Sequence, residues 1–282
     1  MSIDTGIRPA TVAPLRPVDP RLKVTGPRVL RSEWAKLWSL RSTWITLGLG
    51  LLFLIAFGVI GALRYKSMTG AGRTMDPDFA DSTALSLAQF GVPFAMIAFG
   101  VLGVLTTAGE YSTGMIRSTL AAVPRRLPVL WSKATVYGLI VYVVGLLGAV
   151  VAFAITSAVV SGTKAAMSFT DDGVLRSLAG SAVYLSLAGI IGVALGAVLR
   201  STAGGISTMV GTFLLLPGLM SLLPSSWQTH ITRYLPSNAG ESIFALHHDA
   251  GTLSPGAGLL VLLGWTLLAL GGAAYRLRRS DA

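Results

Sequence analysis

Residues 43–63 read TWITLGLGLLFLIAFGVIGAL, a stretch without a single charged side chain. A helix of this length crosses about 30 Å of hydrocarbon, the thickness of a bilayer core. Because an unpaired backbone group in hydrocarbon costs several kcal/mol, only helices and closed barrels span membranes. Barrel strands alternate polar and apolar residues, whereas this stretch is apolar throughout. It therefore predicts a transmembrane helix.

The rest of the chain repeats this pattern. Hydrophobic residues make up 52% of the 282 residues and charged residues only 12%, a balance that no water-soluble globular surface tolerates. We predict an all-α membrane protein with six transmembrane helices. Their predicted bounds are Thr43–Leu63, Ser82–Thr107, Lys133–Val160, Arg176–Leu199, Ser201–Leu223 and Gly256–Tyr275.

The segments that flank the spans divide the chain further. Residues 1–26 hold four prolines among scattered charges and predict a disordered cytosolic tail. Residues 27–42 predict an amphipathic helix in the headgroup layer, because their apolar side chains recur at helical spacing. Residues 43–276 are then the six-span domain, and residues 277–282 a second cytosolic tail. The expected interfacial anchors are Arg31, Trp34, Lys36, Trp38 and Arg41.

Basic residues are distributed unevenly between the two sides of the predicted spans. One side collects 16 of the 22 Lys and Arg residues. Since basic residues near a span resist translocation, we expect this side to be cytosolic and to hold both termini, in a bacterial plasma membrane. The net charge of +10 is then best explained by anionic membrane lipid, and we expect no nucleic-acid binding.

The predicted spans carry no Asp, Glu, Lys, Arg or His between their end residues, and Gln89 is their clearest amide. This disfavours a channel or ion-coupled carrier, because ion-coupled transport relies on ionisable groups inside the membrane. The absence of cysteine excludes thiolate nucleophiles and cysteine-ligated metals. Adjacent histidines on a loop, at His247 and His248 before Asp249, are a weak pattern, and we expect no metal site.

The chain also lacks Gly-Lys-Ser/Thr, the core of a phosphate-binding loop. We therefore expect no enzyme activity and no cofactor bound by this chain. Active transport would draw on a separate ATPase subunit that binds ATP and magnesium. Glycines such as Gly192 and Gly196 let helices approach closely, and packing within one bundle is favoured over a dimer interface.

The connection between the second and third spans reads GEYSTGMIRSTL over residues 109–120. Pro124 and Pro128 are expected to stop any helix before the third span. A short charged element at the membrane face can dock in a groove of a cytosolic partner and move the helices that it joins. A solvated loop with basic anchors is an equally good interpretation of these residues alone.

The last outer loop carries two sequence patterns that are typical of short helices. Trp227, Ile231 and Tyr234 share a helical stripe, which Pro236 is expected to break. The residues from Asn238 to Glu241 resemble a capping box that opens a second short helix. We predict a re-entrant pair of short helices, with a merely structured loop as the alternative. The candidate outer gate consists of Trp227, Tyr234, Pro236, Asn238 and Glu241.

Three stretches resemble the permease subunit of the type 2 ATP-binding cassette transporter family, in particular actinobacterial export and drug-resistance permeases. They are residues 28–43, residues 109–120 with the following Pro-Arg-Arg, and residues 234–241. The resemblance implies that the connection after the second span is a coupling helix seated on the ATPase subunit. The contact residues that it implies are Glu110, Tyr111, Ser112, Thr113, Gly114 and Arg117.

The resemblance further implies an outer gate, a second permease subunit, identical or related, and export of an amphipathic or lipid-like small molecule. A rival hypothesis from another class is a non-transporting membrane scaffold or sensor that recruits a cytosolic partner.

Overall fold

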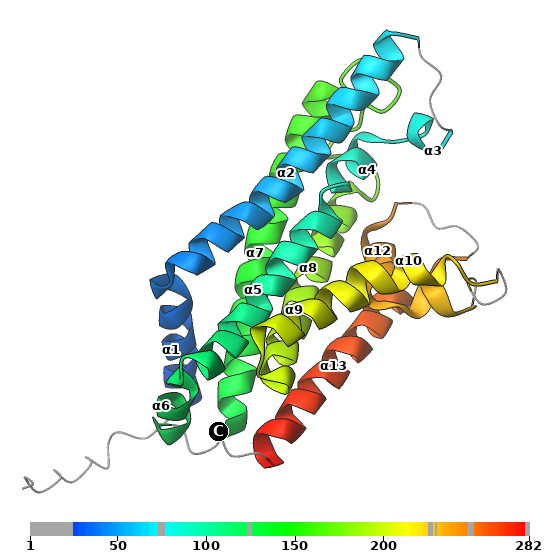
Figure 1. Ribbon diagram of the computed structural model, residues 1–282. Helices are drawn as coiled ribbons and strands as arrows, with labels where there is room; N and C mark the ends of the chain where they lie inside the picture. Colours follow the sequence, from blue (N-terminus) through cyan, green and yellow to red (C-terminus); the bar gives the residue numbers. More distant parts are fainter. Residues whose placement is uncertain are drawn as a thin grey trace, which may run out of the picture.

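The computed structural model describes residues 25–72, 77–122, 126–224, 228, 230–246 and 251–279, and no strand occurs among them. Six of its helical stretches are long and apolar enough to cross a membrane, which confirms the predicted all-α membrane fold (Figure 1). The chain is therefore a multi-pass membrane protein. The elements are α1 (Gly26–Ser39), α2 (Arg41–Gly70), α3 (Pro77–Ala80), α4 (Ala84–Gln89), α5 (Val92–Ser112), α6 (Met115–Ala122), α7 (Arg126–Val159), α8 (Val174–Leu199), α9 (Thr202–Val210), η1 (Gly211–Leu215), α10 (Leu216–Met220), η2 (Thr232–Tyr234), α12 (Pro236–Phe244) and α13 (Pro255–Arg279).

Several helices extend past the predicted ends of the spans. The third span is α7, which begins at Arg126 and includes Pro128 in its first turn. Proline is tolerated there because the first N–H groups of a helix have no intrahelical partner, so the prediction that Pro128 stops a helix is wrong. At the other end of the chain, α13 continues to Arg279 and buries Leu277. The predicted tail 277–282 is thus helical through Arg279, and residues 280–282 lie outside the described part.

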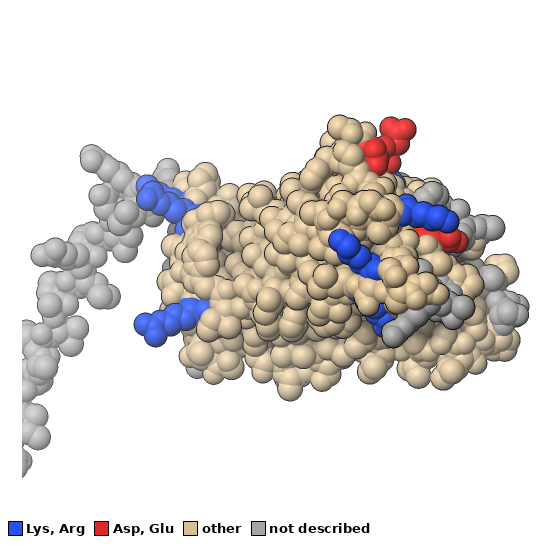
Figure 2. Space-filling model, turned by 90° about the horizontal axis from the view of Figure 1, so that it is seen from above, with Lys and Arg blue, Asp and Glu red and all other residues tan. Residues whose placement is uncertain are grey.

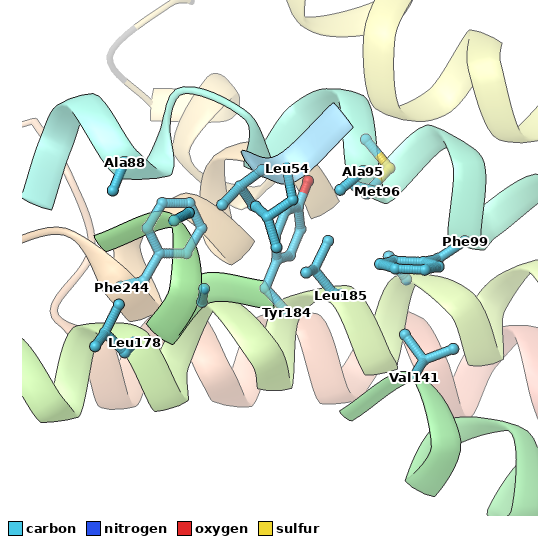
Figure 3. Close-up of a cluster of buried hydrophobic side chains, with 14 of the residues drawn as sticks. Leu54, Ala88, Ala95, Met96, Phe99, Val141, Leu178, Tyr184, Leu185 and Phe244 are labelled. Carbon is cyan, nitrogen blue, oxygen red and sulfur yellow. The ribbon is translucent and has the colours of Figure 1, made fainter. Parts of the chain in front are cut away.

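The centre of the bundle is the packed pair of α5 and α8. A Cβ atom at Gly192 of α8 would lie 2.2 Å from the carbonyl oxygen of Gly100, and one at Gly196 would lie 2.7 Å from that of Val104. The two backbones can approach this closely only because both positions lack side chains. These glycines pack helices within one bundle, as predicted. Figure 3 shows side chains from neighbouring helices, among them Leu185, meeting in the core.

The second span is broken between α4 and α5 by a tight contact with α2. A Cβ atom at Gly91 would lie 2.2 Å from the carbonyl oxygen of Leu54. The short α4 has its own N-cap, since Thr83 accepts a hydrogen bond from the backbone N–H of Ser86 at 3.2 Å.

Basic side chains gather at one end of the bundle, which we call the basic end. In Figure 1, α1, α6 and the C-terminal end of α13 all lie there. Seen along the view of Figure 2, most of the surface is uncharged and the charged side chains are few and separate. Residues 1–24, which include most of the predicted tail 1–26, lie outside the described residues. The described basic residues of this end are Arg28, Arg31, Lys36, Arg41, Arg126, Lys133, Arg200, Arg276, Arg278 and Arg279.

The fifth span is the most loosely packed of the six. It consists of α9, a π-helical turn at Gly211–Leu215 and α10, and it runs at an angle to α5 and α8 (Figure 1). Its side chains Leu214, Leu215 and Leu219 are exposed, as is Leu222 in the turn that follows. A π-turn widens the helix and commonly marks a functional position. The span therefore presents an apolar surface that the other described residues do not cover.

Candidate functional site

Four charged side chains meet at the basic end, between α1, α5 and α7. We call Glu33, Lys36, Glu110 and Lys133 the charge cluster. The Lys133 ammonium lies 2.6 Å from Glu33 Oε2 and 2.9 Å from Glu110 Oε1. The Lys36 ammonium lies 2.7 Å from Glu33 Oε1 and 3.2 Å from Glu110 Oε1. Two carboxylates and two ammonium groups thus balance in charge.

The charge cluster is buried. Glu33, Glu110 and Lys133 are each 4% exposed or less. The predicted spans carry no charged group between their end residues. At the basic end, however, α5 continues to Ser112 and α7 begins at Arg126, so Glu110 and Lys133 lie within these two helices. Charges taken out of water must be paired or they strongly destabilise a fold. The cluster is therefore a structural junction of three helices.

The two members of the charge cluster on α1 have shifted pKa values. Burial alone would raise the pKa of the Glu33 carboxyl, but the ammonium groups of Lys133 and Lys36 outweigh it and hold the pKa below its usual value. Burial would lower the pKa of Lys36, yet the carboxylates of Glu33 and Glu110 outweigh it and raise this pKa. Both shifts favour the charged forms, so the ion pairs persist across the neutral range.

A sequence signal for this cluster exists, although it was missed. Val29, Glu33 and Leu37 lie four residues apart and form the buried face of α1. A carboxylate within a stripe at this spacing faces the protein interior and needs a basic partner there. Lys133, at the first position of the predicted third span, supplies that partner. Neither Glu33 nor Lys133 was among the predicted site residues.

The segment after α5 is exposed and forms what we call the elbow, residues 112–115. Ser112, Thr113, Gly114 and Met115 are all exposed, and Gly114 adopts a φ of +73° that favours glycine. The short α6 that follows is tied back to α1, since Lys36 donates a hydrogen bond to the Thr119 hydroxyl at 3.3 Å. The elbow is thus a protruding turn on a fixed base.

The predicted coupling residues separate into two groups. Ser112, Thr113 and Gly114 are at the surface of the elbow, whereas the carboxylate of Glu110 is buried in the charge cluster and cannot be a surface contact in this conformation. Tyr111 is half-buried, and the guanidinium of Arg200 lies 5.0 Å from its ring centre. The side chain of Arg117 lies outside the described part of the structure.

The predicted interfacial anchors also separate. Trp34 and Trp38 are exposed on α1 and form a row with Trp44, with ring centres 5.5 and 4.4 Å apart. Tryptophan rings favour the membrane–water interface. Arg31 and Arg41 are exposed as well. The prediction for Lys36 is wrong in that its ammonium turns inward to the two carboxylates instead of outward to lipid.

The loop between the fifth and sixth spans, predicted to be an outer loop, contains two short helical segments, η2 and α12, but its predicted capping box is wrong. Proline begins α12 at Pro236, with no side-chain cap, because its fixed φ suits the first helical position. Asn238 is therefore inside the helix, where its side-chain oxygen accepts a hydrogen bond from Ser237 at 3.1 Å. Tyr234 is exposed and its carbonyl accepts a hydrogen bond from Trp265. Trp227 lies outside the described residues.

The helix α12 is held firmly against the bundle. The Arg176 guanidinium donates hydrogen bonds to the carbonyls of Ile243 at 3.1 Å and Ala245 at 2.8 Å, and Ser177 donates to that of Phe244. These bonds satisfy carbonyl groups that a helix C-terminus leaves unpaired. Figure 3 shows Phe244 beside Leu178 of α8. The helix is thus a fixed part of the bundle in this conformation.

Among the described residues, no group of three or more His, Cys, Asp or Glu side chains could hold a metal ion. His247, His248 and Asp249 lie outside them. No protein-family model matches this sequence, and no curated protein matches it either.

Proposed function

We propose that this chain is the permease subunit of an ATP-binding cassette transporter that exports an amphipathic or lipid-like small molecule from a bacterial cell. The ATP would be hydrolysed by a separate subunit seated on the elbow. The observation that supports this most is the joining of the exposed elbow, through the buried charge cluster, to three helices of the bundle.

The geometry suits transmission of force. A partner that binds Ser112, Thr113 and Gly114 touches the turn between α5 and α6. Glu110 lies one helical turn before this surface and pairs with Lys36 on α1 and with Lys133 on α7. Displacement of the elbow would therefore move α1, α5 and α7 together. Because α5 packs tightly on α8, the motion would reach the centre of the bundle.

The distribution of basic residues supports the orientation that the proposal needs. The described basic side chains gather at the end that holds α1, the elbow and the C-terminal end of α13 (Figure 1). By the positive-inside tendency, this end faces the cytosol, where an ATPase subunit would have access to ATP. Both described chain ends would then be cytosolic.

The uncovered fifth span supports a second permease subunit. Its leucines at 214, 215 and 219 are exposed in the single chain, and its helix touches mainly α5 and α8. In a dimer, a second subunit would cover such a surface and enclose a path between the two copies.

Two matched variants test the proposal. Gly114 and Gly162 both have positive φ, +73° and +78°, and a Cβ atom at either would meet nothing within 4 Å. Gly114→Trp and Gly162→Trp therefore impose similar local strain, but only the first obstructs the elbow. We expect ATP-hydrolysing activity to co-purify with the wild type and with Gly162→Trp, and to be lost from Gly114→Trp at equal yield of chain. Equal activity in both variants, or none with the wild type, would count against the proposal.

A further inference from the structure

A pocket of about 610 Å³ opens at the end of the bundle opposite the basic end, between α4, the start of α5 and α12. This volume is within the usual range for sites that hold a small molecule. The pocket is lined by Asp81, Thr83, Ser86, Gln89, Phe90, Pro93, Phe94, Glu241, Phe244, Ala245 and Leu246. Sequence analysis assigned Glu241 to an outer gate and gave no role to the other side chains.

The walls of the pocket are fixed by hydrogen bonds between three segments. Gln89 donates through its side-chain nitrogen to the Ser177 hydroxyl at 2.7 Å, and Ser177 donates to the carbonyl of Phe244. Thr83 and Ser86 are engaged with each other in the cap of α4. These polar groups therefore hold α4 and α12 at a set distance across α8. A pocket with fixed walls binds a ligand at little cost in ordering.

The polar character of the pocket is acidic. Asp81 and Glu241 both line it, and neither carboxylate has a hydrogen-bond or ion-pair partner within the described ranges. The Glu241 side chain is accessible to solvent, yet the surrounding protein desolvates it and raises its pKa. The guanidinium of Arg176 is committed to the carbonyls of α12, and that of Arg233, which lines a neighbouring pocket with Glu241, lies over the Tyr234 ring. The lining of the pocket thus carries two carboxylates and no basic side chain.

The apolar wall is aromatic. Phe90 and Phe94 line the pocket with their rings 6.2 Å apart, and Phe94 stacks on Phe57 of α2 with a centre-to-centre distance of 3.8 Å. Phe90 is 57% exposed, so its ring is available to a ligand. Aromatic faces attract organic cations and bury apolar bodies of similar size.

We propose that this pocket binds an amphipathic organic cation, with the positive charge near Glu241 and Asp81 and the apolar body against Phe90 and Phe94. An anionic ligand would be repelled by the two carboxylates, and a neutral ligand would leave them without a partner. Binding does not depend on the ATPase. Identification of this cation with the exported molecule rests on the function proposed above.

Tetraphenylphosphonium and tetraphenylborate are suitable probes because they share size and shape and differ in charge. Equilibrium dialysis with the full chain in dodecyl maltoside, which carries no charge, separates binding from transport. We expect saturable tetraphenylphosphonium binding that weakens about tenfold or more in Glu241→Gln, because a carboxylate and a cation attract strongly at short range in a partly desolvated site. Asp172→Asn, which removes an exposed outer carboxylate outside the pocket, should leave the affinity unchanged.

Further variants separate charge from shape. Glu241→Gln should not weaken tetraphenylborate binding, whereas Phe90→Ala should weaken the binding of both ions. Three results would overturn the inference. The first is equal tetraphenylphosphonium affinity in Glu241→Gln and Asp172→Asn, and the second is equal weakening of the binding of both ions by Glu241→Gln. The third is the absence of saturable tetraphenylphosphonium binding. Each of these failures concerns the pocket alone, since the ATPase is absent from the assay.

Competition identifies the source of the natural cation. Phosphatidylethanolamine carries the same chemistry as a lipid, an ammonium group joined to an apolar body. Displacement of tetraphenylphosphonium by this lipid would assign the pocket to a headgroup, and lack of displacement would assign it to a free small molecule. Either result requires that the pocket binds tetraphenylphosphonium, so the competition is measured only after saturable binding has been found.

Discussion

Replacement of Lys133 by methionine should destabilise the chain more than the same replacement of an exposed lysine does. Lys133 is 4% exposed and compensates two buried carboxylates, Glu33 at 2.6 Å and Glu110 at 2.9 Å. Removing one partner of a buried ion pair costs about 3–5 kcal/mol, because the remaining charge is left uncompensated. Since Lys36 stays within 3.2 Å of both carboxylates, we expect the lower end, about 3 kcal/mol.

The assay is reversible unfolding in mixed micelles of denaturing and mild detergent, with Lys66→Met as the control. Lys66 is exposed on α2, and its replacement should change the free energy of unfolding by about 0.5 kcal/mol or less. Replacing Glu110 by glutamine in the Lys133→Met background should recover most of the loss, because the carboxylate of Glu33 and the ammonium of Lys36 then balance each other. If Lys133→Met were as stable as Lys66→Met, the charge cluster would not be a junction of the fold.

Three further predictions follow from packing and from pKa shifts. Gly192→Ala should lower the free energy of unfolding by about 1–3 kcal/mol, because its Cβ would meet a backbone carbonyl at 2.2 Å. In the same unfolding assay, Gly264→Ala on α13 should have little effect, because its Cβ would meet nothing within 4 Å. The lowered pKa of Glu33 means that its carboxylate stabilises the fold above the unfolded pKa and that this stability is lost as the pH falls through the folded pKa. Unfolding at decreasing pH checks this, and Glu33→Gln should show a weaker acid dependence. Because the pKa of Glu241 is raised, a proton competes with the cation for this carboxylate at pH values above the ordinary pKa of a carboxyl group. Tetraphenylphosphonium binding should therefore strengthen as the pH rises through the pKa of Glu241. Equilibrium dialysis at a series of pH values should find this dependence much reduced in Glu241→Gln.

Hydropathy alone predicted the number and type of the spans, because the energetic cost of an unpaired backbone group in lipid leaves no other structure for long apolar stretches. The ends of the helices were harder to predict. Glu110 was placed outside the second span and Lys133 at the first position of the third, although paired charges can continue inside a helix when a neighbour compensates them. The information that pairs them is the three-dimensional contact with α1, which no local pattern contains.

The outer segments show a similar limit. The two short helical segments in the last outer loop were predicted, but the start of α12 was assigned to Asn238 when proline at position 236 already begins it. The pocket was not predicted at all. Its lining comes from α4, α5 and α12, and the bond from Gln89 to Ser177 that fixes its walls joins residues 88 positions apart. Gln89 was noticed as an isolated amide in a span, but its partner could not be read from the sequence.

Transport by purified chain in proteoliposomes, with and without its ATPase subunit, tests the central proposal most directly. We predict that the chain alone adds nothing to the accumulation of tetraphenylphosphonium in protein-free vesicles under the same ion gradient. With the ATPase present, we predict additional accumulation that requires ATP hydrolysis and is lost in Gly114→Trp. Accumulation by the chain alone above that of protein-free vesicles, without nucleotide, would contradict the proposal that the elbow delivers the energy for transport.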